Sequence, residues 1–398
     1  MKNVILLVSK DAFKSDYLPL YGNSFWKTPN IDELAKNGTV FRHHYTVAPS
    51  TAMAFTGMFT GKHPYELSRK DYSHVEKYTE SKTLFDYLDE AGYKCHIIWN
   101  KTYMIVAKPY AECFGQNDSV EFHLLDVAQA VGAHFNHDKP LVRNEQLSKK
   151  ALQDIFDTYN SIDTSEKTFI WIHLPHVLKG RIGYGDDVDL LDEFIGFLRK
   201  KYGDDSIYFT SDHGNMDLTF GKIGYGFDVY QEAIKIPLIT PRISNYSEIT
   251  FNTSNVDLTN IIINKTVNNR EFIISDSAYY AQPHRKTSVI FGRYKYIYNK
   301  QTKIEELYDI EYDPNERCNL LLEKRYDIDR KKTVWTSDEY FYPYWDEAKR
   351  NYQIIKQHFN SFWKKGTRWQ EFKYAFRKKF NWVAWIIYHI KRRKAEKK

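Results

Sequence analysis

Two acidic residues and a histidine stand directly after strand-like segments of this chain, where they could bind one metal ion together. Asp212 and His213 lie near the end of the segment 205–215, directly before Gly214, which lets the backbone pass close, while Asp11 follows the apolar run 3–9. Two carboxylates and one imidazole suit zinc or manganese, with calcium or magnesium as further candidates, and leave a fourth ligand position open. The alternative is that Asp-His-Gly is only a turn and that Asp11 caps a helix.

Thr51 is the candidate for that fourth ligand and for the nucleophile. Ser50 and Thr51 precede the small and apolar run "AMAFTGMFTG". Almost no threonine hydroxyl is ionised at pH 7, but a bound metal lowers its pKa, and a helix N-terminus favours both an alkoxide and an anionic ester. The alternative is that Ser50 or Thr51 only caps the helix that follows.

Histidines supply the candidate proton donors. His173 and His176 belong to the strand-like segment "KTFIWIHLPH". Either could give a proton to a leaving oxygen or bind the ester oxygens, and the alternative is that one of them packs within a loop. His134 and His137 are spaced like metal ligands, but their surroundings lack further ligands, and a surface or core role is favoured.

Alternating strands and helices must position these residues. Apolar runs predict strands at 3–9, 94–100, 167–176 and 205–215, and amphipathic patterns predict helices at 27–38, 81–93 and 186–203. Ligands of open α/β sheets bind beyond the carboxyl ends of the strands, so polar groups at these ends could converge. The pattern predicts an α/β fold with a mostly parallel sheet flanked by helices.

The chain is expected to have three parts. These are a catalytic α/β domain over 1–285, a small antiparallel subdomain over 286–330, and an aromatic, basic and helical tail over 331–398. In the tail, apolar residues recur at three- and four-residue spacing from 371 to 390 and basic residues interleave with them. Such a helix could contact an anionic membrane peripherally through 371–398, or dock on the protein itself.

The charge distribution indicates which classes of partner the chain is expected to bind. The net charge is +6 over 398 residues, but residues 361–398 carry 13 basic and two acidic side chains, so the rest of the chain is slightly acidic. A general nucleic-acid binder is therefore not expected, although the tail alone could bind RNA. Three widely spaced cysteines suggest reduced thiols. The expected location is the cytoplasm, at the inner face of the cell membrane.

Several motifs resemble the sulfatase family of the alkaline phosphatase superfamily. They are the opening "NVILLVSKDAFKSDYLPLYGNSFWKTPNIDELAKNG", then "TSDHG", "YQEAIKIPLITP" and "RYKYIYNKQTKIEELYDIEYDPNERCNL", and the similarity covers residues 3–320. The resemblance implies an alkaline-phosphatase-like fold. It also implies a metal-supported nucleophile that attacks a phosphate or sulfate ester.

Departures from the family pattern narrow the chemistry. Family sulfatases mature a Cys or Ser, followed by Pro-Ser-Arg, to formylglycine nine residues before a Thr-Gly pair. Here that position is Thr51, without the Pro-Ser-Arg. The segment is instead similar to phosphoethanolamine and phosphoglycerol transferases, in which Thr is the nucleophile. The family's acidic pair is Lys10-Asp11 here, and its downstream Lys and His positions are Gly226 and Gly221, so Lys222 is the remaining candidate anion binder.

The resemblance and the tail together lead to one expected function. The chain would be a metal-dependent phosphotransferase with one divalent ion bound by Asp11, Thr51, Asp212 and His213. It would move a phosphoethanolamine or phosphoglycerol group from a phospholipid or other diester donor to a glycan precursor, through a phospho-Thr51 intermediate. The alternatives are a sulfuric-ester or phosphodiester hydrolase of the same superfamily and a catalytically inactive, membrane-bound scaffold.

Overall fold

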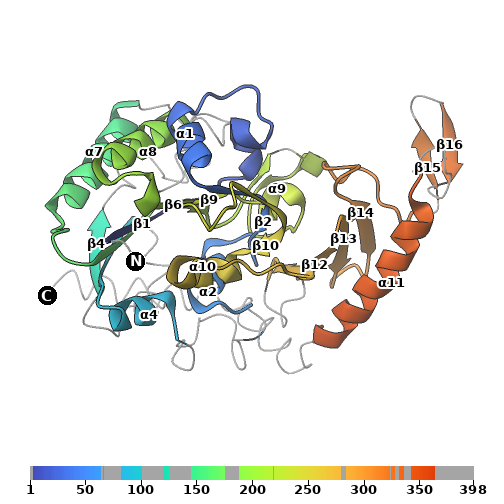
Figure 1. Cartoon of the computed structure of the whole chain (residues 1–398). Helices are drawn as coiled ribbons and strands as arrows, with labels where there is room; N and C mark the ends of the chain where they lie inside the picture. Colours follow the sequence, from blue (N-terminus) through green and yellow to red (C-terminus); the bar gives the residue numbers. More distant parts are fainter. Residues whose placement is uncertain are drawn as a thin grey trace, which may run out of the picture.

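The computed structural model describes residues 3–63, 66, 82–100, 120–125, 145–174, 188–217, 219–278, 284–322, 324–327, 331–335 and 342–363. Within them lie a large central sheet with helices on both faces and a smaller sheet with one helix against it (Figure 1). The predicted α/β fold with a small antiparallel subdomain is confirmed.

The central sheet has eight strands in the order β10-β2-β9-β6-β1-β5-β3-β4. All run parallel except β9, which is antiparallel to both of its neighbours. Their bounds are β1 Val4–Lys10, β2 Thr39–Tyr45, β3 Lys94–Asn100, β4 Val120–Leu125, β5 Thr168–Leu174, β6 Ile207–Ser211, β9 Leu238–Thr240 and β10 Glu248–Ser254. The four strands predicted from apolar runs are thus β1, β3, β5 and β6.

Strand β1 shows why helices must cover both faces of this sheet. Ile5 and Leu7 pack into one apolar core, and Leu6 and Val8 pack into the other. Because side chains alternate along a strand, a continuous apolar run buries both faces. In Figure 1, one face carries α1 Pro29–Asn37, α7 Glu145–Ser161 and α8 Val188–Tyr202, and the other carries α2 Thr51–Thr60, α4 Leu84–Glu90 and α10 Leu258–Asn264.

Different groups cap the N-termini of two of the predicted helices. Thr83 starts α4 with a capping box, because its hydroxyl accepts from the backbone N–H of Asp86 while the Asp86 carboxylate accepts from the N–H of Thr83. Helix α1 is capped differently. Its first N–H groups, at Asn30 and Ile31, donate to the carboxylate of Asp192 on α8. A residue distant in the sequence therefore satisfies the N-terminal N–H groups of α1.

The smaller sheet is antiparallel, in the order β11-β12-β13-β14. Its strands are β11 Phe272–Asp276, β12 Lys286–Phe291, β13 Tyr294–Asn299 and β14 Glu305–Asp309. It thus takes up β11, which precedes the expected boundary at residue 286. Helix α11, Trp345–Phe362, lies along this sheet in Figure 1 and buries Ala348, Ile355 and Phe359 against it.

Short elements complete the described chain. They are β7 Met216–Asp217, β8 Ile223–Gly224, α9 Gln231–Ile234, β15 Lys324–Asp327 and β16 Lys332–Trp335. Strand β16 and helix α11 both fall in the segment expected to be a helical tail. The proposed membrane-contact segment, 371–398, lies outside the described residues. None of the described helices is long and apolar enough to cross a membrane.

Candidate active site

Three neighbouring parallel strands bring the predicted acidic residues and one histidine together. Strand β1 lies between β5 and β6. Asp11 follows β1, Asp212 follows β6, and His173 is the last but one residue of β5. One ligand atom from each of the three lies within 4.8 Å of the other two, and all three residues are buried. The convergence that was predicted from the strand ends is therefore present.

Asp212 is held so that one carboxylate oxygen faces the site. Its Oδ1 accepts hydrogen bonds from the backbone N–H of Ala12, at 3.1 Å, and of His213, at 2.8 Å. Its Oδ2 is buried and accepts no hydrogen bond within the described part of the chain. A buried carboxylate oxygen without a donor is costly unless a cation or donor faces it.

Gly214 closes the turn as predicted. A Cβ at this position would lie 2.0 Å from the backbone oxygen of Glu232, so any side chain would force the two segments apart. The close approach is fixed by the hydrogen bond from the Gly214 N–H to the Ala233 oxygen, at 2.9 Å. Asp-His-Gly is thus a turn, as in the alternative interpretation, and also the turn that aims Asp212 and His213.

His213 connects Thr51 to the two carboxylates. Its Nδ1 lies 2.8 Å from the carbonyl oxygen of Gly214, which can only accept, so Nδ1 carries the hydrogen and Nε2 is the acceptor. Nε2 lies 3.1 Å from Thr51 Oγ1, 3.3 Å from Asp212 Oδ2 and 3.7 Å from Asp11 Oδ1. The hydroxyl of Thr51 therefore donates to His213.

Thr51 is the first residue of α2, and Ser50 occupies the N-cap position. The Ser50 side chain makes no capping hydrogen bond, and the Thr51 side chain bonds to His213. Side-chain capping, the alternative role for these hydroxyls, is therefore not what they do. The first N–H groups of a helix lack partners within the helix, so the start of α2 offers donors and a positive dipole end beside Thr51.

His173 is fixed by a residue that the sequence analysis did not select. Ser9, its partner in the β1–β5 register, lies 2.9 Å from His173 Nδ1 through its Oγ. The same Oγ accepts a hydrogen bond of 2.8 Å from the indole N–H of Trp171. The indole N–H can only donate, so His173 Nδ1 is the one of these two contacts that can accept the Ser9 hydroxyl hydrogen. This arrangement satisfies both donors and leaves the imidazole hydrogen on Nε2. The sequence signal that could have identified Ser9 is a polar residue in the last positions of an otherwise apolar strand.

Burial sets the charge of His173. The ring is 1% exposed, and desolvation lowers the pKa of the imidazole below its ordinary value, although the charges of Asp212 and Asp11 oppose this. A neutral His173 with its hydrogen on Nε2 can donate to an oxygen in the site. The ring of Phe55, one turn along α2 from Thr51, packs edge-on against it with centroids 4.9 Å apart.

The arrangement fits a divalent cation. The donor set is two buried carboxylates and the Nε2 lone pair of His213, which lies 3.3 Å from Asp212 Oδ2 and 3.7 Å from Asp11 Oδ1. Ligands at about 2.0–2.2 Å from a tetrahedral ion lie about 3.3–3.6 Å apart, which is close to these separations. The buried Oδ2 of Asp212 is the structural sign of a group that a cation would satisfy.

Other predicted residues have different surroundings. Lys222, the candidate anion binder, forms an ion pair with the buried Asp228. His176, His134 and His137 lie outside the described residues. Tyr225 covers the site from the β7–β8 side, with its ring tilted over His213 at a centroid distance of 4.5 Å, and 40% of it is exposed. The sequence analysis did not select this tyrosine.

Curated relatives of the chain include two bacterial sulfatases. An arylsulfatase of Clostridium perfringens is 31% identical over 98 residues, which are 25% of this chain and 20% of that protein. An ulvan-active sulfatase of Formosa agariphila is 23% identical over 256 residues, which are 60% of this chain and 48% of that protein. The chain thus spans less than half the length of the curated relatives it matches.

Solved structures share the fold at low identity. A 2-O GAG sulfatase superposes with a TM-score of 0.65 at 15% identity, covering 91% of this chain and 93% of that chain. A phosphonate monoester hydrolase of Agrobacterium radiobacter gives a TM-score of 0.60 at 13% identity, covering 90% and 96%. The sulfatase family itself matches residues 2–204, just over half of the chain. By that match, the chain belongs to the sulfatase family.

Proposed function

We propose that this protein is a metal-dependent hydrolase of phosphate-type esters, with Thr51 as the nucleophile and water as the final acceptor. The observation that carries the proposal is the 3.1 Å contact between Thr51 Oγ1 and His213 Nε2, beside the buried carboxylates of Asp11 and Asp212. Membership of the sulfatase family supports an enzyme that cleaves anionic esters. The phosphonate monoester hydrolase among the structural neighbours supports phosphorus as the centre attacked.

The side chain at position 51 is the reason for preferring phosphate to sulfate. Formylglycine is an aldehyde at Cβ, and the Cβ of threonine carries a methyl group, so oxidation of Thr51 would give a ketone instead. An unmodified alkoxide remains a competent nucleophile for phosphorus, provided that its pKa is lowered. This argument favours phosphodiesters or phosphonate monoesters.

The residues divide the reaction between them. A divalent ion held by Asp11, Asp212 and His213 would lower the pKa of the Thr51 hydroxyl and neutralise charge on the ester oxygens. Thr51 loses its proton to water, its Oγ1 bonds to phosphorus, and the P–O bond to the alcohol breaks. The N–H at Nε2 of His173 donates a hydrogen bond to the leaving oxygen and stabilises the charge that develops on it, and the leaving oxygen takes its proton from water. Water then attacks the phosphorus and loses a proton to the solvent, the P–O bond to Thr51 breaks, and the Thr51 oxygen regains a proton from water.

Two other functions remain candidates for specific reasons. Sulfate-ester hydrolysis is supported by the names of the curated relatives, an arylsulfatase and an ulvan-active sulfatase. Transfer to an alcohol, such as a glycan hydroxyl, follows from the resemblance of the Thr51 segment to threonine-dependent transferases, with a phospholipid as the donor. The same covalent intermediate would serve transfer and hydrolysis, and only the acceptor differs.

A substrate panel tests the proposal. Purified, zinc- or manganese-loaded protein would be assayed on aryl esters of phosphate, phosphonate, phosphodiester and sulfate type. We expect phosphodiester or phosphonate turnover that Thr51→Ala abolishes, and a mass increment on Thr51 in the wild type after a rapid acid quench. Sulfate turnover by the unmodified chain would establish the sulfatase alternative. If added glycerol is incorporated into the product, the enzyme transfers the phospho group to an alcohol.

The inactive scaffold is tested by the same panel. It predicts no turnover of any ester by the metal-loaded wild type and no effect of Thr51→Ala. Turnover that persists unchanged in Thr51→Ala would instead show that another group is the nucleophile. In either case the hydrolase proposal would be wrong.

A further inference from the structure

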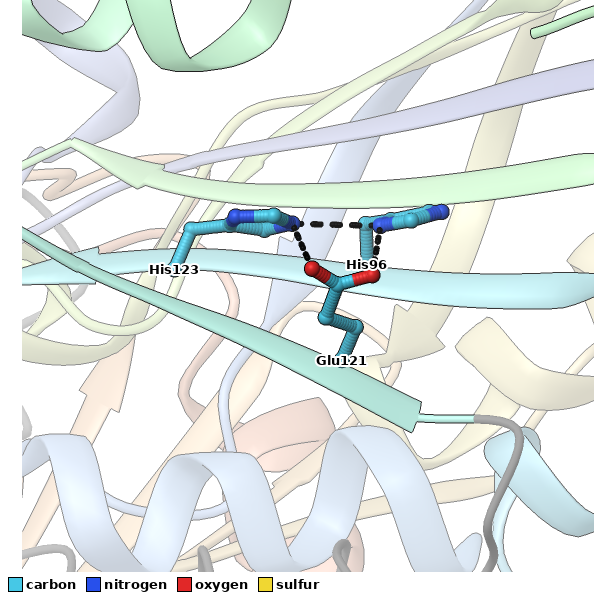
Figure 2. A group of neighbouring side chains, drawn as sticks. All are labelled: His96, Glu121 and His123. Atoms are coloured by element: carbon cyan, nitrogen blue, oxygen red, sulfur yellow. Dashed lines mark hydrogen bonds and ion pairs between the residues drawn. The ribbon is translucent and has the colours of Figure 1, made fainter. Parts of the chain in front are cut away.

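A second group of candidate metal-ligating side chains lies on β3 and β4, at the edge of the central sheet that β4 forms. His96 is near the start of β3, and Glu121 and His123 are on β4, the edge strand of the central sheet. His96 pairs in register with Glu121, and His123 follows two positions later on the same face of β4. The register of the two strands thus places all three side chains together, as Figure 2 shows.

The ligand atoms converge at separations suited to a small cation. His96 Nδ1 lies 3.1 Å from His123 Nε2 and 3.5 Å from Glu121 Oε2, and His123 Nε2 lies 3.8 Å from Glu121 Oε1. Ligand atoms about 2.0–2.1 Å from a tetrahedral zinc ion are about 3.3 Å apart. In Figure 2, the facing nitrogens of the two rings and the Glu121 carboxylate enclose one point, with one carboxylate oxygen toward each ring.

The charges around this point favour a cation. Glu121 forms ion pairs with no lysine or arginine of the described chain; its ion-pair partners there are the two histidines. Imidazoles beside a carboxylate that is not paired with a lysine or arginine are ligands for zinc and similar ions.

We propose that His96, Glu121 and His123 bind one divalent transition-metal ion of the zinc class, independently of the catalytic site. The nitrogens that face each other, His96 Nδ1 and His123 Nε2, would bind the ion, and each ring would carry its hydrogen on its other nitrogen. His96 is 9% exposed, His123 17% and Glu121 66% at the side chain, so the fourth coordination position opens on the solvent side. The ion would join the edge strand β4 to β3.

Zinc stoichiometry of four full-length variants tests this site. Chelator-treated wild type, Asp212→Asn, His123→Gln and the double variant would be titrated with zinc by calorimetry, and bound zinc measured after gel filtration. We expect Asp212→Asn to keep one equivalent that the double variant loses. His358→Gln, at a histidine on α11, is the matched control and should bind as much zinc as the wild type.

A milder variant and a second readout distinguish loss of the zinc ligands from misfolding of the variant. Glu121 is exposed, so Glu121→Gln should leave the fold intact and weaken zinc binding at this site by about a hundredfold. Zinc should also slow hydrogen exchange of the amides of 120–125 in Asp212→Asn, and not in the double variant. Zinc that stays bound in the double variant, or an Asp212→Asn protein that binds none, would overturn the proposal.

Discussion

Replacing Ser9 by alanine would remove the hydroxyl that joins Trp171 to His173. Ser9 is fully buried and its Oγ has two contacts, 2.8 Å from the Trp171 indole nitrogen and 2.9 Å from His173 Nδ1. The substitution removes the acceptor of the Trp171 indole N–H and the hydroxyl partner of His173 Nδ1. It also removes the group that keeps the His173 hydrogen on Nε2, toward the site.

The magnitude follows from these two lost hydrogen bonds. Loss of a buried hydrogen-bond partner costs about 1–3 kcal/mol, so Ser9→Ala should lower the free energy of unfolding by about 2–6 kcal/mol. The catalytic effect is separate. A hydrogen-bond donor placed at the charge that develops in the transition state contributes about a hundredfold or more, and a His173 that samples the wrong tautomer should lose about tenfold in kcat. KM should change much less, because Ser9 is not placed to touch the ester.

Urea unfolding followed by tryptophan fluorescence, with kcat and KM on the substrate found in the panel, would measure both effects. The matched control is Ser288→Ala, because Ser288 is a fully buried serine whose Oγ has no hydrogen-bond partner within the described chain. The control should lower stability by less than about 1 kcal/mol. If Ser9→Ala matches the control in stability and the wild type in kcat, the role assigned to Ser9 is wrong.

Four further predictions follow from the site and the tail. Asp212→Asn should reduce kcat/KM by about a hundredfold or more. After both proteins are treated with a chelator to remove metal, the variant should be at least as stable as the wild type in urea, because Asp11 then faces one buried charge fewer. Burial lowers the pKa of His44 to about 3 from 6.5. As pH falls below 6.5, the unfolded chain therefore binds a proton at His44 that the folded chain does not bind, so the free energy of unfolding falls with acid. His44→Gln should reduce the slope of the free energy of unfolding against pH by about 1.4 kcal/mol per pH unit, as measured by urea titrations from pH 6 to 4. Tyr225→Ala should raise KM for aryl esters about threefold or more in steady-state assays with kcat little changed, because the ring covers His213 at the entrance. Removal of 371–398 should abolish flotation with anionic liposomes, and equal flotation of both chains would refute membrane contact by this segment.

The sequence alone identified the elements and most of the candidate ligands. Continuous apolar runs predict strands that are buried on both faces, and β1, β5 and β6 formed where such runs lie. Asp11, His173 and Asp212 could be selected because each stands at the end of such a run, and parallel strands bring their carboxyl ends to one edge of the sheet. This reasoning needs only local pattern and chain direction.

The tertiary structure decided what each of these side chains can do. Ser9 and His173 are 164 residues apart, and only the β1–β5 register makes them partners and so fixes the His173 tautomer. Whether Thr51 caps a helix or faces His213 likewise depends on how α2 sits against the turn after β6. The cluster of His96, Glu121 and His123 depends on the pairing of β3 with β4. Local sequence patterns carry no information on register between distant strands, because many pairings bury the same apolar faces equally well.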